Sequence, residues 1–192
     1  MLSEQEGPQK QTDAKALKAW WNSTKDKPFV LPRRKNYDVC SILFPTLCSW
    51  IRFHIRYLVI ITVSKVPSSV IKILLYRRMG VNIGKGVYIS PWVFLDPMFP
   101  ELIELKDGCF LGGGCKLLTH EYTANNFRIG KISIGNNSVI GAFSIIRSGV
   151  SIGCNVTTGL GCVVVRNIED SKIAIGNPAR ILRGTENNTW DL

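Results

Sequence analysis

Two histidines occur in the sequence, and one of them, His120, stands where an apolar run breaks into the polar stretch KLLTHEYTANNF. Neutral imidazole accepts a proton near pH 7, so a histidine in such a place can activate a hydroxyl group as a general base. The plainer alternative is that His120 only ends a strand and packs there. The polar residues after it, 122–133, break a regular pattern and indicate a protruding loop that walls a binding site. This context favours proton abstraction as the role of His120.

The pattern that this loop interrupts is a six-residue repeat, which begins at Ile83. Its first position is aliphatic in ten of eleven hexads, and its fifth position is mostly small or β-branched. A period of six fits neither a strand nor a helix alone, but it fits a short strand plus a turn, and three such units make a coil of about 18 residues. The repeat therefore predicts a mainly β fold, a parallel β-helix of about four coils. The first positions are Ile83, Ile89, Leu105, Leu111, Leu117, Ile134, Ile140, Ile146, Ile152, Thr158 and Val164.

The first 80 residues carry most of the positive charge, with 14 Lys and Arg against 5 Asp and Glu, whereas the rest carries 10 against 9. We expect a polar segment and linker over residues 1–36, with a short helix near 13–21 and a basic end at 33–35. Residues 37–80 are expected to form a basic amphipathic helical extension, with one helix over 68–79. An excess of this kind favours an anionic partner. No nucleic-acid-binding module is recognised, so a membrane is the favoured anionic partner.

Two roles for the extension stay open. Its longest uncharged run, 39–51, has thirteen residues, which is too short to cross a bilayer. Its helices can cover the open end of the solenoid and pack between subunits. Alternatively, basic helices that expose Trp50, Phe53 and Leu58 can lie in an anionic membrane interface. No secretory signal is visible, so we expect a cytoplasmic protein, with peripheral contact at the inner face of the membrane as the second possibility.

Residues 83–183 resemble the hexapeptide-repeat acyltransferases, and within them the maltose, galactoside and xenobiotic O-acetyltransferase branch. Three features carry the resemblance: the hexads, the Thr119–His120 pair before the loop, and the phrase IAIGNPARILR that begins at Ile173. They cover about half of the chain. The resemblance implies a left-handed β-helix over 81–176, a cap and tail over 177–192, a homotrimer with sites between subunits, and acetyl-CoA as donor.

For the acceptor side, the resemblance implies that His120 is a general base for direct attack on the thioester by a hydroxyl of a sugar or glycan, either free or lipid-linked. It places Asp96 at the hydroxyl groups of the acceptor, although an Asp-Pro pair is also ordinary turn chemistry. Glu121 and Tyr122 are further acceptor candidates beside the base. Tyr122 stands where the family often has a second histidine, so the resemblance does not fix the acceptor contacts here.

For the donor side, the resemblance implies small residues that let the pantetheine arm approach and cations that hold the adenosine phosphates. The expected donor contacts are Ala142, Gly159, Gly161, Lys172, Arg180 and Arg183.

Other functions fit the residues less well. A zinc enzyme of this fold needs three histidines at the metal, and only His54 and His120 exist, so no metal is expected. A noncatalytic scaffold or binding module is the main alternative, and it would tolerate replacement of His120. An acetyltransferase for a non-sugar hydroxyl is the other alternative.

Overall fold

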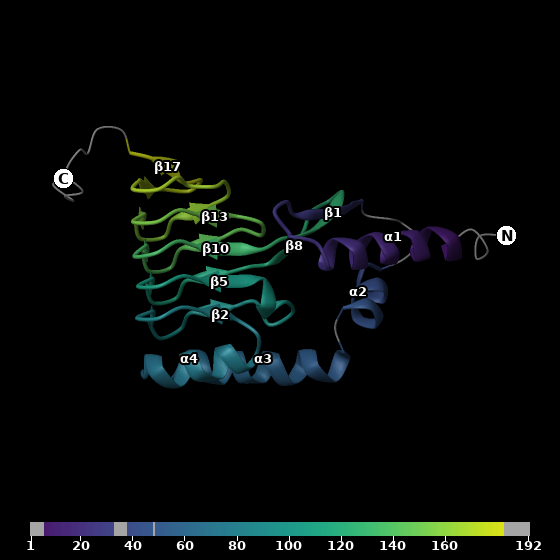
Figure 1. Cartoon of the computed structure of the whole chain (residues 1–192), viewed down its shortest axis with the longest axis horizontal. Helices are drawn as coiled ribbons and strands as arrows, with labels where there is room; N and C mark the ends of the chain where they lie inside the picture. Colours follow the sequence, from purple (N-terminus) through teal and green to yellow (C-terminus); the bar gives the residue numbers. More distant parts are fainter. Residues whose placement is uncertain (1–5, 33–37, 48, 183–192) are drawn as a thin grey trace.

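The computed structural model describes residues 6–32, 38–47 and 49–182. From Asn82 onward the chain winds into a solenoid of short parallel strands stacked in three sheets (Figure 1). Helices lie beneath its first coil, and a small separate sheet projects from one side. The predicted parallel β-helix of about four coils with a helical N-terminal extension is confirmed.

Each sheet of the solenoid takes one strand from each of the first four coils, and the second sheet has two more strands at its upper end. The first contains β2 (Asn82–Ile83), β5 (Ile103–Leu105), β10 (Ile132–Ile134) and β13 (Ser151–Ile152). The second contains β3 (Tyr88–Ile89), β6 (Phe110–Leu111), β11 (Val139–Ile140), β14 (Thr157–Thr158), β16 (Ile173–Ile175) and the antiparallel β17 (Arg180–Ile181). The third contains β4 (Phe94–Leu95), β7 (Lys116–Leu117), β12 (Ile145–Ile146) and β15 (Val163–Val164).

The hexads stack in strict register. In the third sheet, Leu95 pairs with Leu117, Leu117 with Ile146, and Ile146 with Val164, and all four side chains are buried. Leu95 heads a hexad that the sequence pattern had placed inside an interruption. Thr158 is the polar exception at a first position, and its buried hydroxyl accepts the N–H of Gly141 at 3.0 Å, which satisfies both groups.

Helices α3 (Trp50–Ser64) and α4 (Ser69–Arg78) close the lower end of the solenoid (Figure 1). Ile60 and Tyr76 face the first coil and are fully buried. At the end of α4, the Arg77 guanidinium donates to the carbonyls of Ile83 at 2.8 Å and Gly84 at 2.7 Å, which ties the helix to that coil. The helix predicted over 68–79 is confirmed. Among the described residues, no helix is both long enough and apolar enough to cross a bilayer.

The N-terminal elements pack beside the solenoid. They are α1 (Glu6–Trp21), β1 (Phe29–Pro32) and α2 (Cys40–Thr46), and the basic residues 33–35 lie outside the described part. Strand β1, which the sequence did not predict, pairs antiparallel with β9 (Asn126–Ile129), and β9 pairs with β8 (His120–Tyr122). The segment expected as a protruding loop is therefore a β-hairpin, and β1 forms a third strand beside it.

A second hydrophobic core fixes this small sheet in place. It contains Leu17 of α1, Leu31 of β1, Ile42 of α2, Phe99 of the first coil and Phe127 of the hairpin, all nearly inaccessible to solvent. A 3₁₀ turn, Pro100–Leu102, comes directly after Phe99. The hairpin that begins at His120 thus packs into this second core through Phe127 and Ile129.

Candidate active site

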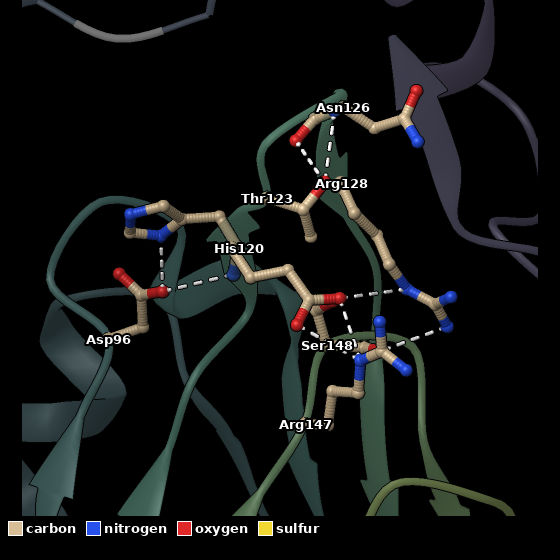
Figure 2. A network of polar contacts seen from close by, with 8 residues as sticks. Asp96, His120, Thr123, Asn126, Arg128, Arg147 and Ser148 are labelled. Carbon is tan, nitrogen blue, oxygen red and sulfur yellow. Dashed lines mark hydrogen bonds and ion pairs between the residues drawn. The ribbon is translucent and has the colours of Figure 1, made fainter. Parts of the chain in front are cut away.

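The centre of the candidate site is a hydrogen bond between Asp96 and His120 (Figure 2). The pairing of β4 with β7 places the ends of these strands next to each other, so Asp96 of the first coil meets Thr119 and His120 of the second. Asp96 Oδ2 lies 2.6 Å from His120 Nδ1. The same oxygen accepts the N–H of Thr119 at 2.9 Å, its hydroxyl at 2.8 Å and the N–H of His120 at 3.2 Å.

The Asp96 carboxylate is ionised despite its burial. Burial by itself raises its pKa, but hydrogen bonds from His120, Met98 and Thr119, together with electrostatic attraction to the His120 ring, outweigh that effect and lower the pKa below its usual value. An ionised carboxylate only accepts hydrogen bonds, so Nδ1 of His120 carries a proton and Nε2 is left as the basic nitrogen. The His120 side chain is 24% exposed, whereas that of Asp96 is 1% exposed.

This geometry gives Asp96 a different place from the one expected. The family resemblance assigned it to the acceptor, but five hydrogen bonds within the chain take up both of its oxygens. The carboxylate lies behind the histidine and orients it, and solvent does not reach it. We therefore place Asp96 as a positioning residue for His120.

Aromatic rings surround the imidazole. The ring centroids of Phe99 and Phe127 both lie 6.1 Å from that of His120, and the centroid of Tyr122 lies 6.4 Å from it. Phe99 and Phe127 are buried, while Tyr122 is half exposed. The Tyr122 hydroxyl lies 3.4 Å from Cys40 Sγ of α2, so the helix helps to hold this ring. Tyr122 is the acceptor candidate that solvent reaches beside the base.

Glu121, the other acceptor candidate, is engaged by Arg128 and Arg147 of its own chain, the two arginines labelled in Figure 2. Arg147 Nε donates to its two oxygens at 2.8 and 2.9 Å, Arg128 Nε lies at 3.5 Å, and the Ser148 hydroxyl donates at 3.3 Å. Arg147 and Ser148 come after β12 in the third coil, whereas Glu121 and Arg128 belong to the hairpin. The cluster therefore clamps the hairpin onto the solenoid. Neither arginine was among the residues predicted from the sequence.

The predicted donor contacts fall partly along a groove of about 690 Å³ on the outer side of the second sheet. Ala142 and Gly159 line it, together with Gly141 and Leu160. A Cβ added at Gly141 would lie 2.3 Å from the carbonyl oxygen of Gly159, so the coils stack here only because glycine is present. Small residues leave this wall open to a ligand with a narrow chain.

The remaining donor candidates lie near the upper end of the groove. Gly161 is exposed in the turn after Leu160, with a φ of +63° and open space where a side chain would be. Lys172 and Arg180 are exposed at the last strands, β16 and β17, and Arg183 lies outside the described residues. His120 is not among the residues that line the groove, because it comes after the third sheet rather than the second.

Two other catalytic arrangements find no support. Residues 149–153 read GVSIG, which matches the sequence pattern of a serine nucleophile elbow. Its Ser151 lies on β13 within an ordinary hexad, not at a strand-to-helix turn, and no hydrogen bond joins it to either histidine in the described part of the chain. Nor do the residues described include a group of three or more His, Cys, Asp or Glu placed to hold a metal ion.

No protein-family model matches the chain. Comparison with named proteins gives relatives of similar length. "Putative acetyltransferase YvoF" of Bacillus subtilis is 34% identical over 128 residues, which cover 66% of this chain and 74% of that protein. An acetyltransferase-named protein of Staphylococcus aureus, SAS0727, is 40% identical over 128 residues, which cover 66% and 80%. The galactoside O-acetyltransferase of Escherichia coli is 42% identical over 52 residues, 27% of this chain and 26% of that enzyme.

Solved structures share the fold. A maltose O-acetyltransferase from Clostridium difficile has a TM-score of 0.56 at 19% identity and covers 69% of this chain and 85% of that one. The hexapeptide-repeat acetyltransferase VCA0836 from Vibrio cholerae, solved with acetyl-CoA, has a TM-score of 0.54 at 17% identity and covers 70% of this chain and 85% of that one. A galactoside acetyltransferase solved with coenzyme A has a TM-score of 0.50 at 20% identity and covers 71% of this chain and 83% of that one. These likenesses confirm the predicted left-handed hand of the β-helix.

The Asp96 geometry predicts how acid affects stability. Because the pKa of Asp96 is lowered in the folded state, its contribution to the free energy of unfolding is complete above the unfolded value of about 3.9 and is lost as pH falls through the folded value. Urea unfolding should therefore show Asp96→Asn less stable than wild type near pH 7, with the difference shrinking below about pH 4. A difference that stays constant from pH 7 to pH 3 would contradict the lowered pKa.

The clamp at Glu121 predicts a coupling energy. In a double-mutant cycle of Glu121→Ala and Arg147→Ala, we expect a coupling of about 1 kcal/mol in the free energy of unfolding, reduced by high salt because both side chains are partly exposed. A cycle of Glu121→Ala with Arg166→Ala serves as control, since Arg166 is an exposed cation elsewhere on the solenoid. Equal coupling in the two cycles would show that Glu121 does not clamp the hairpin.

Proposed function

This chain belongs to the hexapeptide-repeat acetyltransferases, and from that membership we propose that it moves an acetyl group from acetyl-CoA to a hydroxyl group of a sugar or glycan, with His120 as the general base. The observation that carries the proposal is the 2.6 Å contact between Asp96 and His120 Nδ1. A buried carboxylate that fixes one imidazole nitrogen leaves the other free to take a proton.

The proposed reaction has one chemical step of attack and one of release. Nε2 of His120 removes the proton of the acceptor hydroxyl, and the oxygen attacks the thioester carbonyl carbon. The carbon–sulfur bond then breaks, and the thiolate of coenzyme A leaves with the proton that His120 returns. Asp96 stabilises the imidazolium that forms between these events, because its negative charge lies against Nδ1. An acetyl ester and free coenzyme A are the products.

The groove on the second sheet is the proposed donor site. Ala142 and Gly159 would flank the pantetheine arm, and Gly161 would admit it near the turn. Lys172 and Arg180 would hold the adenosine phosphates of coenzyme A. Arg183 is proposed for the same role on the sequence resemblance alone. Support comes from the small residues along the groove and from relatives of the same fold that were solved with acetyl-CoA or coenzyme A.

We propose that the chain works as a homotrimer. The groove runs along the second sheet and His120 lies beyond the third, so a donor in the groove of one copy reaches a histidine most directly on a neighbouring copy. The turns after the second sheet also carry Phe143 and Leu160, which are 74% and 80% exposed. Association would cover such large apolar side chains.

A sugar is the proposed acceptor class. The named relatives include a galactoside O-acetyltransferase, and a solved structure of the fold is a maltose O-acetyltransferase. In this chain, Tyr122 offers an apolar ring face beside the base, which suits the mixed surface of a sugar. Glu121 is excluded from the proposed acceptor set while Arg147 and Arg128 hold it. We further propose that the protein is cytoplasmic and that residues 37–80 make a peripheral contact with the membrane.

The proposal predicts a large loss of rate without loss of donor binding. Release of coenzyme A from acetyl-CoA would be followed with maltose, simple galactosides or water as acceptor. His120→Ala should lower kcat by about 100- to 10,000-fold, since that is the usual effect of removing a general base. Calorimetric titration should give the same Kd for acetyl-CoA in both proteins.

The matched control is His54→Ala, because His54 is an exposed histidine on α3 that bonds only to the carbonyl of Trp50 within the described chain. Its kcat should stay within twofold of wild type. If His120→Ala also stays within twofold, His120 is not the base. If the wild-type protein does not bind millimolar acetyl-CoA, the noncatalytic scaffold replaces the transferase.

A further inference from the structure

The lower end of the molecule exposes an unusual number of large apolar side chains. On α3, Ile51, Ile55 and Leu58 succeed each other at helical spacing and are 71%, 59% and 65% exposed. On α4, Val70 and Leu74 are 77% and 58% exposed. Apolar patches of this kind mark interaction sites on folded proteins. The basal face is defined by Ile51, Ile55, Leu58, Val70, Ile71 and Leu74.

The two helices present this face in the same direction. Both bury their opposite sides against the first coil, α3 through Ile60 and Val63 and α4 through Lys72 and Tyr76. They also pack against each other and lie together beneath the solenoid (Figure 1). The exposed side chains of both helices therefore point away from the solenoid and form one surface.

The charged side chains of the two basal helices are all cationic. No Asp or Glu occurs between Asp38 and Asp96 in the sequence. Arg52, Lys65 and Arg78 are exposed on or beside the two helices. Lys72 does not add to this charge at the surface, because its side chain is fully buried. An apolar face on helices whose charged residues are all cations fits the boundary between lipid headgroups and acyl chains.

A groove of about 670 Å³ at the edge of the face gathers three guanidinium groups. It is lined by Arg52, Arg56 and Arg78, with Ile51 and Met79 among its apolar walls. Arg56 pairs with Glu101. Among the described residues, no side-chain hydrogen bond or ion pair involves the guanidinium of Arg52 or Arg78, and both side chains are exposed. Guanidinium forks match phosphate oxygens, so the groove suits a phosphate group.

We propose that the basal face docks on an anionic phospholipid membrane, with its apolar side chains at the acyl boundary and a lipid phosphate in the arginine groove. A second copy of the chain fits the face less well, since a twofold contact would set the same cations against one another. The proposed function includes a peripheral membrane contact of residues 37–80. The present proposal rests on that contact and adds which surface makes it and which class of lipid it meets. It does not require acetyl transfer.

Docking in this way places the candidate site close to the membrane. Asp96 and His120 belong to the first two coils above α3 and α4. Neighbouring strands lie about 4.8 Å apart, so the Asp96–His120 pair lies on the order of 10–15 Å above the basal helices. A glycan carried on a lipid could reach His120 at that height. The proposal therefore favours a lipid-borne acceptor over a free sugar.

The test is vesicle flotation of the full chain with phosphatidylcholine vesicles and with vesicles that contain about 30% phosphatidylglycerol. We expect binding to the anionic vesicles only, weakened by high salt. Arg52→Gln with Arg78→Gln should raise the lipid concentration for half-binding about 10- to 30-fold. Leu58→Ser with Leu74→Ser should weaken binding several-fold. The control pair Lys106→Gln with Arg166→Gln removes equal charge from other exposed positions and should change nothing.

Several outcomes would overturn the proposal. One is absence of binding to anionic vesicles, and another is an equal effect of the control pair. A third is a fall in oligomer mass of the Leu58→Ser, Leu74→Ser protein with unchanged vesicle binding, which would give the face to a second copy. Titration of the same proteins with acetyl-CoA distinguishes failure of the two proposals. If the wild-type protein does not bind acetyl-CoA, the transferase proposal is wrong, but the flotation result still decides whether the basal face binds membranes.

Discussion

The register of the stacked hexads is the constraint on which the rest of the structure depends. Pairing of Leu95 with Leu117 aligns the residues just beyond the two strands, and it sets Asp96 against Thr119 and His120. A slip of one residue would turn the buried leucines outward and separate the carboxylate from the imidazole. The fold therefore creates the site by the same pairing that builds its core. Burial of Asp96 is tolerated because five hydrogen bonds meet its charge.

The β8–β9 hairpin forms one side of the candidate site around the Asp96–His120 pair. It leaves the solenoid at His120, is clamped by Glu121 to Arg147 of the third coil, and gains a third strand from β1 near the N-terminus. Phe127 of the hairpin and Phe99 of the first coil are buried in one core with Leu17 and Ile42. The N-terminal segment thus takes part in the candidate site through packing, although none of its side chains is proposed to react.

The sequence predicted the features that depend on local spacing. The hexads predicted the coils, and the break after His120 predicted the excursion that carries it. The contacts of Asp96 and Glu121 were harder to foresee, because they depend on which residues stack across coils of unequal length. Leu95 offered a signal: as a hexad head six residues after Ile89, it would have placed Asp96 beneath the residues after Leu117. Strand β1 had no such signal, since its pairing joins residues about one hundred positions apart.

In the proposed mechanism, a donor thioester held in the groove of the second sheet meets the Asp96–His120 pair of a neighbouring copy. The most direct measurement is a crystal structure of the protein grown with coenzyme A. We expect the ligand along Ala142 and Gly159 of one copy, with its sulfur within about 4 Å of His120 Nε2 of a neighbouring copy. A ligand whose sulfur lies far from every His120, or a groove covered by another subunit without room for the ligand, would rule out this arrangement of donor and base.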